Sequence, residues 1–364
     1  MLMTRISIIA FLFLSLVSCK KEPADFIWEK SFGTGCAYFV GSTADSGILA
    51  CGTMNDNPYL IKLSREKKTI VEYTSPYSGA FISAWSDDSC FIAAGIRNGK
   101  MLLECIDNSG TGKWDTTFTS AFEIGLTRLY HYGNGDFLAL GSPCPDSVSS
   151  AAAGLLLVRF DTTGSIILKK EITDKYFIAS GTMAVDNSGN IFLPLTRKSG
   201  SAKAKASVAK YNSDFQRIWE TELYNNPDFG AVCTAVTMDN QGMIYMTGKT
   251  EVSRQEGILD NSFVASMNSS GTVRWKNYLE FDNTGSALLF DDDVLMILNR
   301  NCFVINRVKP DDGSDDGILR MLSVCNSKST NAFGYSMDID PDGNILTSGE
   351  RAKTFYVALK ASVK

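Results

Sequence analysis

Histidine is almost absent from this chain of 364 residues, which contains His131 and no other. Its nine cysteines include no Cys-x-x-Cys pair, so zinc sites built on the usual histidine and cysteine spacings are excluded. A catalytic triad needs a base, and one histidine without a nucleophile motif beside it gives that chemistry little support. We assign no catalytic residue and expect His131 to lie on an inner strand.

The chain also lacks an excess of basic residues, since 35 Lys and Arg stand against 40 Asp and Glu. Nucleic-acid binding depends on a basic stripe, so nucleic acid is not an expected partner. Helical periodicity is missing as well, which leaves the short apolar runs to form strands. Most cysteines stand singly in such runs, where we expect free thiols rather than disulfides.

The longest apolar run, at residues 6–17, is N-terminal and resembles a bacterial lipoprotein signal. It is too short to span a bilayer comfortably, and it ends in a lipobox-like Leu-Val-Ser before Cys19. The resemblance implies acyl chains on Cys19 and a lipid anchor in the bacterial envelope, where we expect the outer membrane. We therefore predict a signal peptide at 1–18 and a polar tether at 19–25. An ordinary secretory signal is the alternative.

One pattern recurs at intervals of roughly 40–55 residues along the rest of the chain. A turn rich in Asp, Asn and Gly precedes an apolar strand, a second apolar strand, another polar turn and a strand that frequently carries Trp. The first half of this unit occurs at 43–52, 86–95, 132–141, 185–195, 238–248, 290–299 and 340–349.

The last copy of the repeat lacks its final strand, whereas FIWEKSF at 26–32 is a Trp-bearing strand without a partner before it. The missing last strand and the unpartnered first strand are both explained if the N-terminal strand completes the last unit. We therefore predict an all-β fold for residues 26–364, a single seven-bladed β-propeller domain of four-stranded antiparallel blades closed by the N-terminal strand.

Four tryptophans fall at equivalent places in the predicted outer strands, and we expect their rings to pack between blades. Trp85 belongs to an inner strand and is not part of this series. The four are Trp28, Trp114, Trp219 and Trp275.

The repeat resembles the bacterial seven-bladed propeller repeats with a D-x-x-G-N turn, and its outer half is similar to the quinoprotein repeat. The quinoprotein motif is matched in one copy, by Asp107, Thr111, Gly112, Lys113 and Trp114. A quinone enzyme would imply a calcium ligand set, a catalytic Asp and often a vicinal disulfide, and none of these can be placed here. We interpret the stretch as a turn and an outer strand, and expect no cofactor.

The segment DIDPDGNIL begins like a calcium loop, with Asp338, Asp340 and Asp342 at alternate positions. An EF-hand would have a Glu where Gly349 stands, so the same carboxylates also fit an ordinary blade turn. A calcium loop and an ordinary blade turn therefore both stay open as interpretations. Residues 291–293, three consecutive Asp in the neighbouring copy, are expected to form a solvated acidic tip.

The connections between the second and third strands are long in three successive blades, at 142–154, 196–206 and 249–261. We expect them to form a wall at the channel mouth, and disordered insertion is the alternative. The predicted function is a membrane-anchored envelope lipoprotein that binds or scaffolds a protein or glycan partner on this face. The alternative is a carbohydrate-active hydrolase or lyase with carboxylates at the channel mouth.

Overall fold

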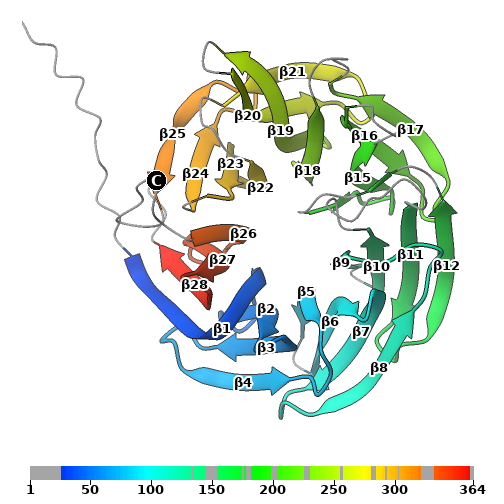
Figure 1. Cartoon of the computed structure of the whole chain (residues 1–364), viewed down its shortest axis with the longest axis vertical. Coiled ribbons are helices and arrows are strands. Elements are labelled where there is room, and N and C mark those ends of the chain that lie inside the picture. The colour runs from blue at the N-terminus through cyan, green and yellow to red at the C-terminus, as the bar shows by residue number, and fades with distance from the viewer. Residues whose placement is uncertain are drawn as a thin grey trace, which may run out of the picture.

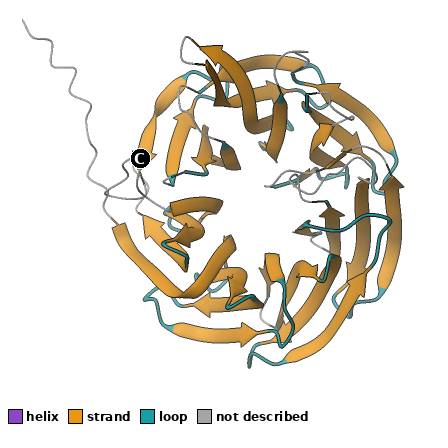
Figure 2. Ribbon diagram, in the orientation of Figure 1, coloured by secondary structure: helices purple, strands orange, loops and turns teal. Residues whose placement is uncertain are grey.

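A computed structural model describes most of the chain from Phe26 onwards. The described part consists of strands, turns and loops, without a helix (Figure 2). None of these residues belongs to a helix able to cross a membrane. The described residues are 26–87, 89–132, 134–143, 154–173, 176–177, 182–197, 203–224, 230–254, 257–279, 284–291, 293–301, 303–320 and 332–360.

The strands form seven antiparallel blades around a central axis, so the predicted propeller fold is confirmed (Figure 1). Within blades 1 to 6, the chain runs from the innermost strand near the axis to the outermost strand at the rim. Blade 1 contains the second half of β1 (Phe26–Ser42), then β2 (Ile48–Met54), β3 (Asn57–Leu63) and β4 (Thr69–Thr74). Blade 2 contains β5 (Ala80–Ser86), β6 (Cys90–Arg97), β7 (Lys100–Asp107) and β8 (Gly112–Phe118).

The remaining blades follow in chain order. Blade 3 contains β9 (Leu126–His131), β10 (Asp136–Ser142), β11 (Gly154–Asp161) and β12 (Ile166–Thr173). Blade 4 contains β13 (Tyr176–Phe177), β14 (Ala184–Val185), β15 (Ile191–Arg197), β16 (Lys205–Tyr211) and β17 (Arg217–Glu222). Blade 5 contains β18 (Ala231–Met238), β19 (Ile244–Arg254), β20 (Gly257–Met267) and β21 (Val273–Tyr278). Blade 6 contains β22 (Gly285–Asp291), β23 (Val294–Asn299), β24 (Val304–Val308) and β25 (Asp315–Arg320), and blade 7 contains β26 (Ala332–Ile339), β27 (Ile345–Arg351) and β28 (Thr354–Lys360).

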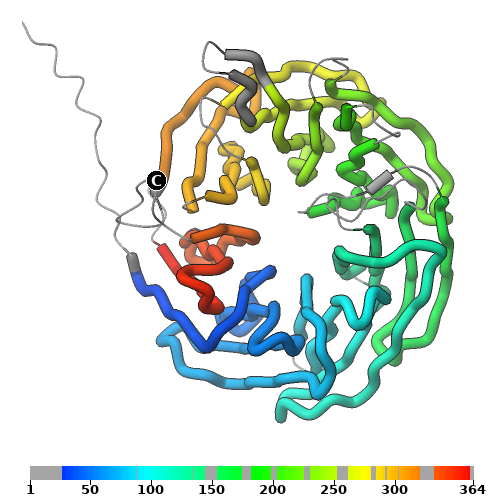
Figure 3. The backbone as a smooth tube through the Cα atoms, viewed as in Figure 1, coloured from blue at the N-terminus to red at the C-terminus, as the bar shows by residue number. Residues whose placement is uncertain are grey.

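Strand β1 closes the ring by serving two blades. Its first half pairs with β28 as the outermost strand of blade 7, from Phe26 opposite Lys360 to Thr34 opposite Thr354. Its second half pairs with β2 as the innermost strand of blade 1. The start and end of the described chain therefore meet (Figure 3). Closure by the N-terminal strand is confirmed, and one continuous strand of 17 residues achieves it.

The hydrophobic core is divided into seven clusters, one for each interface between neighbouring blades. The second and third strands are covered by a blade on each side, so consecutive residues are buried, as in the run from Leu102 to Ile106. This double cover explains why strict alternation is lost in these strands. The five described cysteines among the apolar runs are buried free thiols, as expected.

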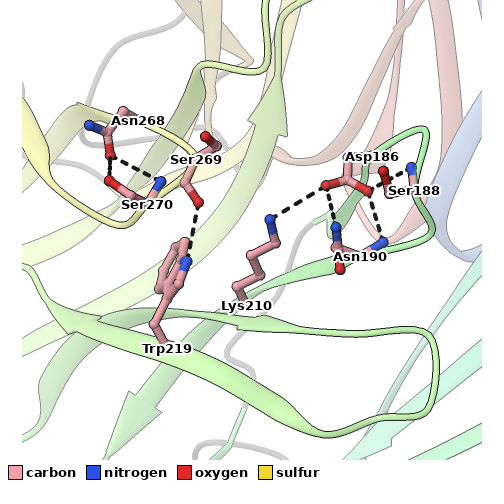
Figure 4. Close-up of polar contacts among 8 residues, drawn as sticks. All are labelled: Asp186, Ser188, Asn190, Lys210, Trp219, Asn268, Ser269 and Ser270. Carbon is pink, nitrogen blue, oxygen red and sulfur yellow. Dashed lines mark hydrogen bonds and ion pairs between the residues drawn. The ribbon is translucent and has the colours of Figure 1, made fainter.

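The four tryptophans of the outer strands link each blade to the next through a repeated contact. Trp219 of blade 4 donates its indole N–H to the carbonyl oxygen of Ser269, in the turn between the third and fourth strands of blade 5, at 3.2 Å (Figure 4). The ring lies over Gly271 of that turn, where a methyl group would come within 3.0 Å of it. The same donation joins Trp28 to Arg65, Trp114 to Thr162 and Trp275 to Pro310. The predicted packing between blades is confirmed.

The boundary between blades 3 and 4 has other residues in place of the outer-strand Trp and the turn Gly. Strand register places Leu168 where blades 2, 4, 5 and 7 have a Trp, two residues after the start of pairing. The turn position that is Gly271 in blade 5 is Phe215 in blade 4, with a φ of 59° and 0% exposure. Both side chains join one apolar cluster, so the large ring comes from the turn here and the smaller side chain from the strand.

The polar turns are held by short side chains that bond their own backbone, as the sequence predicts. Asp186 accepts hydrogen bonds from the backbone N–H groups of Ser188 and Asn190, and Lys210 lies 3.6 Å from the same carboxylate (Figure 4). These turns, between first and second and between third and fourth strands, lie on one side of the ring, called here the turn face. The connections between second and third strands, and those between blades, lie on the opposite loop face.

Candidate functional site

The innermost strands surround a central cavity of about 710 Å³, a volume within the usual range for ligand sites. All seven blades contribute to its wall. The polar and aromatic residues of this wall include Tyr38, Ser42, Trp85, Asp87, Arg128, His131, Tyr335 and Asp338.

Two carboxylates line the end of the cavity toward the turn face. Asp338, near the end of β26, accepts a hydrogen bond from the backbone N–H of Ser42 in the neighbouring blade at 2.7 Å. Burial raises the pKa of Asp338, and the bond from Ser42 opposes this shift. Burial would also raise the pKa of Asp87, but hydrogen bonds from Ser89 and Cys90 outweigh it and lower this pKa. The two acids therefore differ in the ease with which they lose a proton.

His131 ends strand β9 at the same side of the cavity. Its ring stacks on Trp85 with ring centres 4.2 Å apart, and Trp85 in turn contacts Phe137. Burial lowers the pKa of His131, while the charge of Asp87 acts in the opposite direction. The expected inner-strand positions of His131 and Trp85 are confirmed.

An aromatic group lies toward the loop face. Tyr38 of β1 and Tyr335 of β26 meet edge to face at 5.4 Å. The guanidinium of Arg300 lies 5.4 Å from the Tyr335 ring centre and 5.7 Å from that of Phe333. Burial raises the pKa of both tyrosines and of the nearby Cys36 thiol, so all three are neutral at physiological pH.

Arg128 places a cation in the wall between these two ends. Its guanidinium donates to the backbone oxygen of Thr127 at 2.7 Å. Burial lowers its pKa to about 10, which still leaves it charged at neutral pH. The cavity thus combines aromatic rings, one half-buried cation and two unlike carboxylates, a set able to orient a polar ligand.

The loop face carries one element that differs from its prediction. Residues 249–261 were expected as a long loop, but they belong to the extended β19–β20 hairpin, paired without interruption from Ile244–Met267 to Arg254–Gly257. Strand β18 accompanies β19 as far as Thr250, so the outer part of the hairpin has no strand beside it in the described chain. Continuous pairing satisfies the backbone groups of the hairpin, which explains why a strand forms where a loop was expected. Of the other two long connections, 144–153 and 198–202 lie outside the described residues.

The three carboxylates of the possible calcium loop point to different partners. Asp340 accepts from the backbone N–H groups of Asp342 and Asn344 and from the Asn344 side chain. Asp342 pairs with Arg65 of blade 1, and Asp338 bonds Ser42. No group of three potential metal ligands occurs within the described residues. The geometry supports the ordinary turn and adds no support for calcium.

Some predicted residues cannot be compared with the structure. The lipidation site Cys19 and the tether lie outside the described residues, as does Asp292 of the expected acidic tip. The two cavity acids were not identified as a pair from the sequence, because they lie in blades 2 and 7. The available signal was their position: each lies at the turn-face end of an innermost strand, where a side chain can face the axis.

Comparisons with known proteins show the fold and leave the ligand open. The sequence matches no protein-family model and no curated protein sequence. A solved structure of the Neurospora crassa Pan2 WD40 domain is similar, with a TM-score of 0.60 and 12% identity over 92% of this chain and 96% of that one. A protein of unknown function from Bacteroides caccae aligns with a TM-score of 0.47 and 11% identity over 84% of this chain and 98% of that one. The likeness to the WD40 domain shows a propeller fold and does not extend to a binding partner.

Proposed function

We propose that this chain is an envelope lipoprotein whose propeller binds or scaffolds a protein or glycan partner through the loop face. The observation that carries this proposal is the β19–β20 hairpin, which extends blade 5 on the loop face beyond the end of β18. Its strands have 11 residues each, against eight in the corresponding pair of blade 2. Three further residues extend a strand by about 10 Å, which gives the partner a raised edge.

The base of the hairpin is fixed to neighbouring structure, which favours a recognition element over a loose insertion. The Glu251 carboxylate accepts from the backbone N–H of Gly230 at 3.0 Å and from the Lys203 ammonium at 2.6 Å. The backbone N–H of Glu251 also donates to the Gly230 carbonyl at 2.8 Å. A binding surface held in place before contact loses less conformational entropy on association.

The lipoprotein part of the proposal rests on the sequence around Cys19. It is tested by supplying cells with labelled fatty acid. The wild-type chain should be labelled and should sediment with membranes, while Cys19→Ser should do neither. Continued labelling of the variant would contradict an acyl anchor at this residue.

The binding part is tested by shortening the hairpin. Replacing residues 252–259 with Asn-Gly leaves Glu251 and Asp260 as the closing pair and copies the Asn98-Gly99 turn of blade 2. Pull-down from envelope extract and a glycan array with the wild-type protein first identify a ligand. The shortened protein should fold normally and lose that ligand, since shortening a surface connection changes folding free energy by about 1 kcal/mol or less. Unchanged binding would exclude the hairpin.

One observation favours the alternative enzyme. Asp87 and Asp338 line one cavity and have pKa values displaced in opposite directions, a pattern found in acid and base pairs of hydrolases. The two come from blades separated by blade 1, so a substrate would have to reach across that interval. If any bound glycan is cleaved, Asp338→Asn and Asp87→Asn should each abolish cleavage while leaving binding measurable. Cleavage that persists in both variants would exclude this pair.

A further inference from the structure

The chain enters the propeller at the turn face, on the outer rim. Phe26 pairs with Lys360, which itself pairs with Ile345, the first residue after a turn of blade 7. Only residues 20–25 separate this point from Cys19, a distance of at most about 25 Å for an extended chain. If Cys19 is acylated as proposed above, the rim around Phe26 must stay close to the lipid surface.

The turn beside this entry point is unusually basic. Residues 64–68 read Ser-Arg-Glu-Lys-Lys, and the last four are exposed. Of the turns between third and fourth strands in the described chain, this one alone carries three basic residues. The tether adds Lys20 and Lys21 in sequence. The turn face also carries Asp residues, and one of them, Asp342 of blade 7, pairs with Arg65, so Lys67 and Lys68 are the exposed cations of this turn that remain for a lipid surface.

The basic turn is attached to the entry strand by several contacts. Trp28 donates to the Arg65 carbonyl at 3.2 Å, and the Lys30 ammonium donates to the Lys67 carbonyl at 3.1 Å. The Lys67 ammonium lies 5.8 Å from the Trp28 ring centre. These contacts hold the cations at a fixed place relative to the start of β1.

Two exposed isoleucines flank the same turn. Ile27 precedes Trp28 and is 45% exposed, and Ile70 follows the turn and is 52% exposed. Outer strands of blades 3 and 4 also expose isoleucines, so the apolar pair is not distinctive by itself. Its combination with the cations and the chain entry occurs at this rim position.

We propose that this surface, made of Ile27, Lys67, Lys68 and Ile70 and called here the entry patch, docks on anionic lipid headgroups. The proposal rests on the proposed membrane anchor for its location, but its chemistry is independent of acylation. Lysines near an anionic surface are attracted to it, and isoleucine side chains favour the headgroup boundary. Docking in this way turns the loop face and its hairpin away from the membrane, toward a partner.

The test uses residues 19–364 with Cys19→Ser, which lack both the predicted signal peptide and the acylation site, and vesicles of phosphatidylcholine with or without phosphatidylglycerol. We expect co-sedimentation with the anionic vesicles that weakens as salt is raised. Lys67→Glu with Lys68→Glu should weaken partition about thirtyfold or more, because each lysine near an anionic surface contributes about fivefold.

A matched control reverses Lys113 and Lys309, which are exposed at the turn-face rim of blades 2 and 6, and so gives the same net charge. This control should retain most of the vesicle binding, and thermal melting checks that both variants are folded. Equal loss in the two variants, or equal binding to neutral and anionic vesicles, would overturn the entry patch. Fatty-acid labelling of the wild-type chain reports on the anchor separately, so failure of the patch is distinguishable from failure of the lipoprotein proposal.

Discussion

At the boundary between blades 3 and 4, Leu168 and Phe215 stand where other boundaries have a Trp and a Gly, and two substitutions can restore that pair. The burial and the backbone conformation of Phe215 set the expected changes in the free energy of unfolding. Phe215 has no exposed surface and a positive φ. Truncation of a buried Phe costs about 3–5 kcal/mol. Glycine at this backbone conformation recovers about 1 kcal/mol that a side-chain-bearing residue loses there. Phe215→Gly should therefore lower the free energy of unfolding by about 2–4 kcal/mol.

The partner substitution is unfavourable for the opposite reason. Leu168→Trp adds a large ring to a cluster that Phe215 already fills, and overpacking of this kind costs about 1–3 kcal/mol. In the double variant, the introduced indole gains the space that the phenyl ring leaves. Its N–H can then reach the carbonyl two residues before the turn glycine, as Trp219 reaches Ser269. The double variant should be more stable than the sum of the two single effects by at least about 2 kcal/mol.

Urea denaturation followed by far-ultraviolet circular dichroism measures this coupling, because a new indole would complicate fluorescence. The wild type, both single variants and the double variant form one thermodynamic cycle. Additivity within about 0.5 kcal/mol would refute the view that these two positions exchange one ring between strand and turn.

Three further predictions concern stability. Glu104 is buried, with one carboxylate oxygen accepting a hydrogen bond from Tyr73 and the other without a hydrogen-bond partner among the described residues. Burial raises the pKa of Glu104. Its ionisation therefore lowers the free energy of unfolding as pH rises above the pKa of the unfolded chain, near 4.3. Thermal melts of Glu104→Gln should show a gain of about 1–3 kcal/mol at about pH 8 that disappears toward pH 4, and a pH-independent difference would contradict this account. Lys353→Gly should raise the urea midpoint and increase the free energy of unfolding by about 1 kcal/mol, because Lys353 has a φ of 63° in a tight turn. A lower midpoint would show that the contacts of its side chain outweigh the strain of its backbone. Removing residues 26–32 should lower the melting temperature far more than removing 20–25, because only the former unpairs the outermost strand of blade 7, and equal melting temperatures would argue against closure by this strand.

Blade number and ring closure could be predicted because each blade repeats its local chemistry. An Asp or Asn turn next to apolar strands specifies a hairpin whatever surrounds it. The unmatched strand around Trp28 then left one way to complete the last blade. The outer-strand tryptophans were recognised for the same reason, since they recur at a fixed distance from a polar turn.

The residues that line the cavity together could not be predicted from the sequence in the same way. Asp87 and Asp338 are far apart in the chain and meet one cavity because the ring brings their blades round the axis. Within the described residues, the innermost strand of blade 4 consists of the short β13 and β14, which no repeat pattern indicated. The outer part of the β19–β20 hairpin was expected as a loop because its residues are polar and have a weak preference for strands. Such residues can still form a strand when a neighbouring strand pairs with their backbone.

The sequence by itself determined the turns, the strand order and the number of blades, because these depend on residues close together in the chain. The tertiary structure alone decided which polar side chains share the cavity, which surface surrounds the entry of β1, and how Leu168 and Phe215 replace a tryptophan and a glycine. Those features arise between blades, where the shape of the space to be filled depends on two distant segments at once.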